Sequence, residues 1–110
     1  MGEIREIIGE LLKFRDERDW EQFHNPKDLA LAISVEASEL LELYLWKSHE
    51  QADREKVKEE IADILAFTFL LAEKYGFDVM AIVMEKIAKN RLKYPADKVR
   101  GSAKKYTEYE

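Results

Sequence analysis

Two stretches of the chain carry acidic residues at positions where an amphipathic helix would place apolar ones. In the first, Glu36 and Glu39 interrupt an apolar stripe that otherwise recurs every three or four residues. In the second, Glu60 and Asp63 lie about one helical turn apart in a similar stripe. Both faces are therefore expected to be turned toward neighbouring helices, where unpaired charge is costly.

The two acidic pairs match each other in an antiparallel hairpin. Glu36 and Asp63 lie equally far along the chain from a turn near residues 49 and 50, and Glu39 and Glu60 are likewise symmetric about it. A hairpin that turns there sets Glu36 opposite Asp63 and Glu39 opposite Glu60. The sequence thus predicts one site that contains four carboxylates.

Such a group of carboxylates either binds a cation or becomes partly protonated in a low-dielectric site. The sequence has no cysteine, and no histidine lies at helical spacing among these acids. Ligand sets made only of oxygen favour Mg²⁺, with Mn²⁺ as the second choice, over zinc. Because Mg²⁺ usually completes its coordination shell with water and substrate phosphates, the cluster predicts a phosphate-processing site.

The alternative is that the four acids lie on solvated helix faces. Charged residues make up 37% of the chain, and a single E-x-x-E motif in such a sequence is usually solvated. The matched register of the two pairs, and the Leu, Ile and Ala residues that flank them, argue against this alternative.

The overall composition excludes several classes of protein. A length of 110 residues with 46% hydrophobic content predicts one compact domain with a modest core, which self-association would extend. The net charge of -5 argues against binding to a nucleic-acid polymer. The charged start of the chain and the lack of a long apolar run predict no signal peptide, no membrane span and a cytoplasmic location.

Apolar periodicity predicts an all-α bundle of four helices. We expect these helices over residues 3–20, 26–47, 49–75 and 79–93, joined by short connections. The predicted domain covers residues 1–95. Residues 96–110 form a polar tail that is expected to be ordered only if it packs on something.

Local signals mark the ends of these helices. Asn25 before Pro26 is a favourable N-cap, and Ser48 with Gln51 matches a capping box. Gly76 is a typical left-handed helix stop, and Asp78 caps the last helix. That helix is expected to end near Lys93, because Tyr94-Pro95 discourages its continuation.

Aromatic residues gather at both ends of the second helix. Trp20, Phe23 and His24 precede it, and Trp46 lies at its far end. A helix of about 20 residues spans roughly 30 Å, so these residues can share one pocket only if another chain closes the gap. Each alone is more often a packing or interface residue, although a planar base also requires such surfaces.

The last helix places Lys86 and Asn90 on one face, together with Lys93 or Tyr94, and Arg91 is adjacent. Cations near a helix C-terminus are explained by the helix dipole alone. Asn90 is different, because an amide adds little helix propensity and can orient a ligand.

Several segments together resemble a known family, the all-α nucleoside triphosphate pyrophosphohydrolases of the MazG-like and dUTPase superfamily, and within it the dCTP pyrophosphatase branch. The resemblance covers nearly the whole chain. The matching segments are the acid pairs Glu36/Glu39 and Glu60/Asp63, residues 18–24, residues 39–47, Asn90-Arg91 with Tyr94-Pro95, and residues 105–108.

This resemblance implies hydrolysis of dCTP, or of 5-modified dCTP, to the monophosphate and pyrophosphate, in a homotetramer built as a dimer of dimers. Helices from partner subunits would complete each site. The implied residues are Mg²⁺ ligands at Glu36, Glu39, Glu60 and Asp63, base-pocket residues at Trp20, His24 and Trp46, nucleotide contacts at Lys86 and Asn90, and neighbours of unassigned role at Arg91 and Tyr94.

Two departures from the family pattern bear on specificity. Phe67 stands where relatives have a tyrosine, so the resemblance does not decide whether deoxyribose is discriminated from ribose. The turn at residues 48–53 is shorter than in relatives, so the resemblance does not decide which residues form the rim of the pocket. The expected mechanism is metal-assisted in-line attack of water at the α-phosphorus, with Glu39 as the general base.

Three alternatives remain at this point. A ferritin-type di-metal bundle normally needs E-x-x-H motifs, and neither His24 nor His49 has a glutamate three residues before it. A helical interaction module would leave the acids solvated. Within the enzyme interpretation, another pyrimidine triphosphate or a broad set of triphosphates is also compatible with the sequence.

Overall fold

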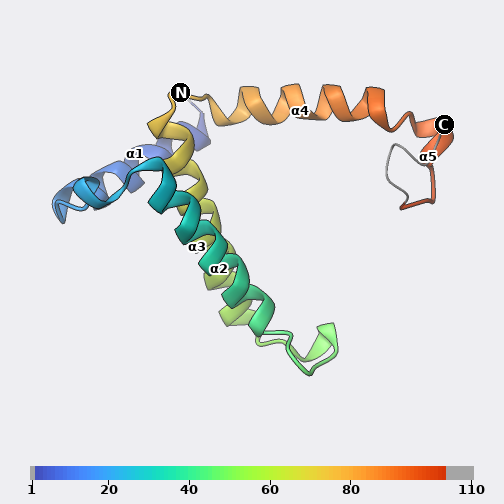
Figure 1. Ribbon diagram of the computed structural model, residues 1–110, viewed down its shortest axis with the longest axis horizontal. Helices are drawn as coiled ribbons and strands as arrows, with labels where there is room; N and C mark the ends of the chain where they lie inside the picture. The colour runs from blue at the N-terminus through green and yellow to red at the C-terminus, as the bar shows by residue number, and fades with distance from the viewer. Residues whose placement is uncertain (1, 104–110) are drawn as a thin grey trace. The chain divides into compact units, whose positions relative to one another are not determined.

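The computed structural model describes residues 2–103 of the chain, and this part contains helices and no strands (Figure 1). The all-α fold predicted from the sequence is therefore confirmed. The elements in chain order are α1 (Glu3–Glu17), the short 3₁₀ helix η1 (Glu21–Phe23), α2 (Pro26–Glu42), the 3₁₀ helix η2 (His49–Gln51), α3 (Arg54–Lys74), α4 (Val79–Lys93) and α5 (Ala96–Val99).

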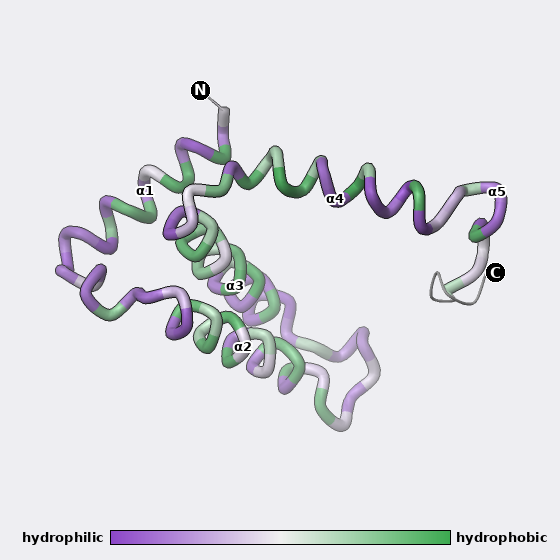
Figure 2. Tube along the Cα trace, turned by 45° about the horizontal axis from the view of Figure 1, so that its top comes forward, coloured by the Kyte–Doolittle hydropathy of each residue, from purple (hydrophilic) through white to green (hydrophobic). Residues whose placement is uncertain are grey.

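The chain divides into two compact units, with the boundary in the sequence between Phe77 and Asp78. In the first unit, α2 and α3 lie side by side as an antiparallel hairpin, and α1 contacts α3 (Figure 1). Figure 2 shows hydrophobic and hydrophilic residues alternating along these helices, as expected for amphipathic segments. The hairpin predicted from the two acidic pairs is thus present.

The core of the first unit lies toward the end of the hairpin opposite η2. Ile8 of α1 and Leu29 of α2 are each only 1% exposed, and Leu70 and Ala72 of α3 are buried beside the start of α2. Burying a side chain of this size contributes about 1.5–3 kcal/mol. The core is small, and the rest of the α2–α3 interface is free to hold polar groups.

Several predicted helix ends are confirmed by the hydrogen bonds found there. The Asn25 side chain accepts from the backbone N–H of Asp28 at 2.9 Å, and Pro26 is the first residue of α2. Gly76 has a φ of +70°, which ends α3 in the left-handed region. The Asp78 side chain accepts from the backbone N–H of Ala81 and caps α4.

Other predicted helix boundaries were wrong by several residues. The first helix ends at Glu17 because Asp19 turns the chain with a φ of +53°. The second ends at Glu42 because the next backbone bonds reach back three residues, and Trp46 then adopts a φ of +61°. Local propensity continues through both segments, but the backbone turns away from the helix there.

The capping box at Ser48 is present, with the backbone N–H of Ser48 donating to Gln51 Oε1 at 3.0 Å. It begins the short η2 rather than a long helix, however. The third helix begins at Arg54, where the Asp53 side chain accepts from the N–H groups of Glu55 and Lys56. The connection between α2 and α3 is therefore longer than the sequence pattern predicts.

The second unit consists of α4 and the one-turn α5, which begins inside the segment predicted to be a polar tail. Exposed apolar side chains occur along α4, among them Met80, Val83, Met84 and Ile87. The division into a domain of residues 1–95 and a tail stays a prediction. The matching segment at 105–108 lies outside the described residues.

Within residues 2–103, every helix is too short or too polar to cross a lipid bilayer. The predicted cytoplasmic location is a separate claim and stays a prediction.

Leu29→Ala should lower the free energy of unfolding by about 2–5 kcal/mol, because it leaves a cavity in a small core. The measurement is urea denaturation followed by circular dichroism. Leu41→Ala is the matched control in the same helix, since its side chain is 67% exposed. Equal losses in the two variants would contradict the placement of the core.

Candidate metal centre and adjoining cavity

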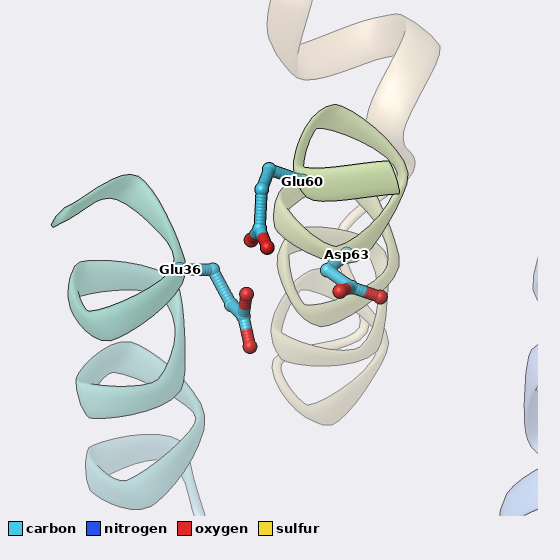
Figure 3. A group of neighbouring side chains, drawn as sticks. All are labelled: Glu36, Glu60 and Asp63. Carbon is cyan, nitrogen blue, oxygen red and sulfur yellow. The ribbon is translucent and has the colours of Figure 1, made fainter. Parts of the chain in front are cut away.

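Glu36 of α2 meets Glu60 and Asp63 of α3 at the interface of the hairpin. Each residue offers a carboxylate oxygen, and these oxygens all lie within 4.8 Å of one another (Figure 3). Glu36 and Glu60 are half-buried, and Asp63 is exposed. The structure thus brings together three of the four acids that the sequence assigned to one site, from the two predicted helices.

The electrostatics of this cluster are unfavourable for three separate negative charges. The pKa of Glu36 is raised to about 7. The neighbouring Glu60 carboxyl is the largest cause, burial is the second, and the nearby Glu39 carboxyl adds to both. In addition, Glu36 Oε2 and Glu60 Oε2 are buried without a hydrogen-bond partner. Buried oxygens that lack a donor fit a cation, which would satisfy both at once.

Glu39 lies beside this cluster rather than within its closest group. Its side chain is exposed, yet it is near enough to Glu36 to raise the pKa of that carboxyl. The sequence set Glu39 opposite Glu60, whereas the structure groups Glu36 with both acids of α3. The role of Glu39 as a metal ligand therefore stays a prediction.

A cavity of about 350 Å³ adjoins the cluster and shares Asp63 with it. Pockets for small molecules commonly begin at about this volume and combine apolar walls with a few polar groups. The residues that line the cavity come from α1, from the segment that follows α1, and from α3. They are Leu11, Phe14, Arg15, Trp20, His24, Asp63, Ala66, Phe67 and Leu70.

Trp20 and His24 bring aromatic surface and a polar atom to this cavity. The rings of Trp20 and Phe14 meet edge to face, with centroids 5.8 Å apart. His24 Nδ1 is buried without a hydrogen-bond partner. Burial lowers the pKa of His24, and the charges of Arg15 and Lys74 lower it further, while Glu21 acts in the opposite direction. The imidazole is therefore mainly neutral at pH 7 and can either donate or accept.

Residues 31–109 match the MazG-like family. The chain belongs to the MazG-like family. The match includes the whole of α3 and the part of α2 that carries Glu36, and it agrees with the family resemblance inferred from the sequence motifs.

Curated relatives of this MazG-like chain include dCTP pyrophosphatase 1 of Rattus norvegicus, which is 40% identical over 116 residues. The protein of the same name from Homo sapiens is 39% identical over the same length. Both alignments cover 98% of this chain and 66% of the relative, so the chain spans about two thirds of their length.

A solved structure with a similar fold is a pyrophosphatase from Archaeoglobus fulgidus DSM 4304. It superposes with a TM-score of 0.80 and is 35% identical in sequence. The superposition covers 86% of this MazG-like chain and 94% of the other chain.

The other candidate residues of this MazG-like chain belong to the turn after α2 and to the second unit. Trp46 is 95% exposed in the turn after α2 and is not among the residues that line the 350 Å³ cavity. Lys86 and Arg91 are exposed on α4, and Asn90 and Tyr94 are half-buried. Their roles in binding stay predictions.

Arg15 is a cavity residue that the sequence analysis missed. Its side chain is only 12% exposed, although its spacing in α1 places it among the polar positions. The available signal was its position in the last turn of the first helix, directly before the aromatic segment. Phe67, noted as a departure from the family pattern, also lines the cavity.

In the metal-free protein, the free energy of unfolding should decrease as pH rises from about 5 to about 8. The pKa of Glu36 is raised to about 7 in the folded state, so the folded protein binds this proton more tightly than the unfolded chain does. That contribution is present at low pH and lost as pH rises through about 7.

The measurement is urea denaturation at several pH values with a chelator present. Glu36→Gln should flatten the dependence over this range, and Glu59→Gln, which alters an exposed neighbour on α3, should not. A wild-type profile that instead rises steadily with pH would contradict the raised pKa.

Proposed function

We propose that this chain hydrolyses dCTP, or 5-modified dCTP, to the nucleoside monophosphate and pyrophosphate with the help of Mg²⁺. The observation that carries this proposal is the acidic cluster of Glu36, Glu60 and Asp63, which shares Asp63 with an aromatic cavity. The cluster suits the metal and phosphates, and the cavity suits a planar base. The dCTP pyrophosphatase 1 relatives support this choice of base.

The three clustered acids are the proposed metal ligands, with Mn²⁺ as the second metal to test. Their two unpartnered buried oxygens and the oxygen-only donor set support a hard divalent cation. When bound, such a cation neutralises charge on phosphate oxygens and lowers the pKa of coordinated water.

Glu39 is the proposed general base that accepts the proton of the attacking water. It is exposed and lies outside the closest group of carboxylates, yet it is close enough to influence Glu36. A carboxylate in this position remains free to accept a proton while its neighbours hold the metal. We propose that the attack takes place at the α-phosphorus.

Trp20 and His24 are the proposed base-binding residues of the cavity. Trp20 provides a ring surface for stacking, and the buried, unpartnered Nδ1 of His24 provides a hydrogen bond to the base. The proposed remaining contacts to the nucleotide, which rest on the family resemblance, come from Trp46, Lys86, Asn90, Arg91 and Tyr94.

Self-association into a tetramer, as a dimer of dimers, is part of this proposal. Exposed apolar side chains on both units support it, among them Leu41, Leu45, Met80 and Met84. An open groove of about 710 Å³ along α1, lined in part by Ile7 and Phe14, also supports it. A partner subunit would supply a second source for residues such as Trp46.

A broader set of substrates is the second candidate function. Phe67 lines the cavity, and its ring carries no hydroxyl group that can form a hydrogen bond to a sugar. Discrimination between deoxyribose and ribose must then rely on other contacts. CTP is therefore the competitor most worth testing.

Purified protein should release pyrophosphate from dCTP and 5-methyl-dCTP faster than from dTTP or dATP when Mg²⁺ is present. Chelation should abolish release, because the cluster would lose its counter-charge. Glu39→Gln should lower kcat by at least about 100-fold. Pyrophosphate is measured with a coupled assay, and Glu59→Gln is the control.

Turnover of other bases at equal rates would contradict the assignment of dCTP. Full turnover by Glu39→Gln would contradict its role as general base. No turnover of any triphosphate by folded, metal-loaded protein would contradict the proposed function as a whole and favour a helical interaction module.

Glu60→Gln should weaken Mn²⁺ and Mg²⁺ binding by at least about ten-fold, because it removes a charged oxygen from the cluster. Isothermal titration calorimetry measures the affinity directly and does not depend on activity. The control is again Glu59→Gln, the exposed neighbour in the sequence. Unchanged affinity in Glu60→Gln would place the metal elsewhere.

A further inference from the structure

The segment between α1 and α2 carries both aromatic residues of the proposed base site, yet its backbone is held mainly by local contacts. The N–H of Trp20 donates to Arg15 O at 3.1 Å, and the N–H of His24 donates to Glu21 O at 2.9 Å. Asp19 has a φ of +53°, and the Gln22 side chain donates to its backbone oxygen at 2.9 Å. These contacts define the shape of the segment but do not fix its distance from α3.

Glu21 connects this segment to the two helices that form the rest of the cavity. Its Oε2 lies 3.1 Å from Arg15 Nη2 at the end of α1. Its Oε1 lies 3.4 Å from Lys74 Nζ in the last turn of α3. Within residues 2–103, the Lys74 contact is the polar link between this segment and α3.

We propose that Glu21 is a positioning residue, which holds Trp20 and His24 at a fixed distance from the cavity residues of α3 and thereby sets discrimination between bases. This inference rests on the proposed function. Glu21 itself does not line the cavity, so it acts through the segment rather than by touching the substrate. Arg15 does line the cavity, and its guanidinium is held by Glu21 and by Asp16.

The exposure of the three partners indicates which property should change. The Glu21 side chain is 57% exposed, whereas Arg15 is 12% and Lys74 is 24% exposed. An ion pair with one exposed partner adds little to global stability. A shift of about 1 Å in a binding group, by contrast, can change reaction rates by up to about 100-fold. Loss of Glu21 should therefore change substrate binding and selectivity far more than it changes the free energy of unfolding.

Glu21 also balances the charge around His24. Arg15 and Lys74 are the cations that act on the His24 imidazole, and Glu21 opposes both. Without Glu21, two cations with no shared counter-charge would remain near the base pocket and repel each other. This repulsion would push the end of α1, from which the segment continues, away from α3 and so enlarge the cavity that both helices line.

Glu21→Gln should raise KM for dCTP by about five- to ten-fold, with kcat and thermal unfolding nearly unchanged. It should also lower the ratio of kcat/KM for dCTP to that for dTTP by a similar factor. Partial unfolding would instead lower the apparent turnover of both substrates by the same factor and leave that ratio constant. Glu55→Gln is the matched control, because Glu55 is an exposed glutamate paired with Lys58 at 3.3 Å.

Lys74→Met tests whether Glu21 acts through α3. If it does, Lys74→Met should raise KM as well, and the double variant should be no worse than Glu21→Gln alone. Fully additive effects would contradict coupling through this contact.

Hydrogen exchange of the backbone amides of residues 20–24 provides a readout that does not require activity. Exchange should be faster in Glu21→Gln than in wild type and unchanged in Glu55→Gln. If wild type hydrolyses no triphosphate, the proposed function fails, and the exchange rates still decide whether Glu21 holds the segment. A Glu21→Gln variant that matches Glu55→Gln in KM, selectivity and exchange would overturn the inference.

Discussion

The close approach of Glu36 and Glu60 across the α2–α3 interface is the constraint on which the first unit depends. Packed helices normally fill such positions with apolar side chains, because a carboxylate loses hydration there. Here the fully buried residues Ile8 and Leu29 lie toward the far end of the hairpin, so the acids occupy a part of the interface that the core leaves free. The neighbouring Glu60 carboxyl and then burial raise the pKa of Glu36, and a bound cation would oppose both effects.

Asp63 connects this acidic cluster to the cavity. It belongs both to the group of clustered oxygens and to the wall of the 350 Å³ cavity, so a ligand in the cavity would extend directly to the cluster. A nucleotide has this same division, with an aromatic base at one end and charged phosphates at the other. The arrangement thus explains how one short chain can combine an apolar aromatic pocket with a dense group of negative charges.

The small core and the exposed apolar side chains have the same cause, which is the short length of the chain. A chain of 110 residues buries a limited fraction of its surface, and much of its apolar area remains outside the core described here. Trp46 is an extreme case, since it is 95% exposed and held in a left-handed conformation that bulky side chains rarely adopt. The proposed tetramer would give such residues a partner surface.

The sequence alone determined the helices, most of their caps and the presence of two matched acidic pairs. These features follow from local rules, as the Asn25 and Asp78 caps illustrate, because each depends on residues within one turn. Only the tertiary structure decided that Glu36 meets both acids of α3, that Glu39 stands beside them, and that Arg15 lines the cavity and pairs with Glu21. Those outcomes depend on where α2 ends, how long its connection to α3 is and how the helices rotate against each other, which are properties of packing between distant segments.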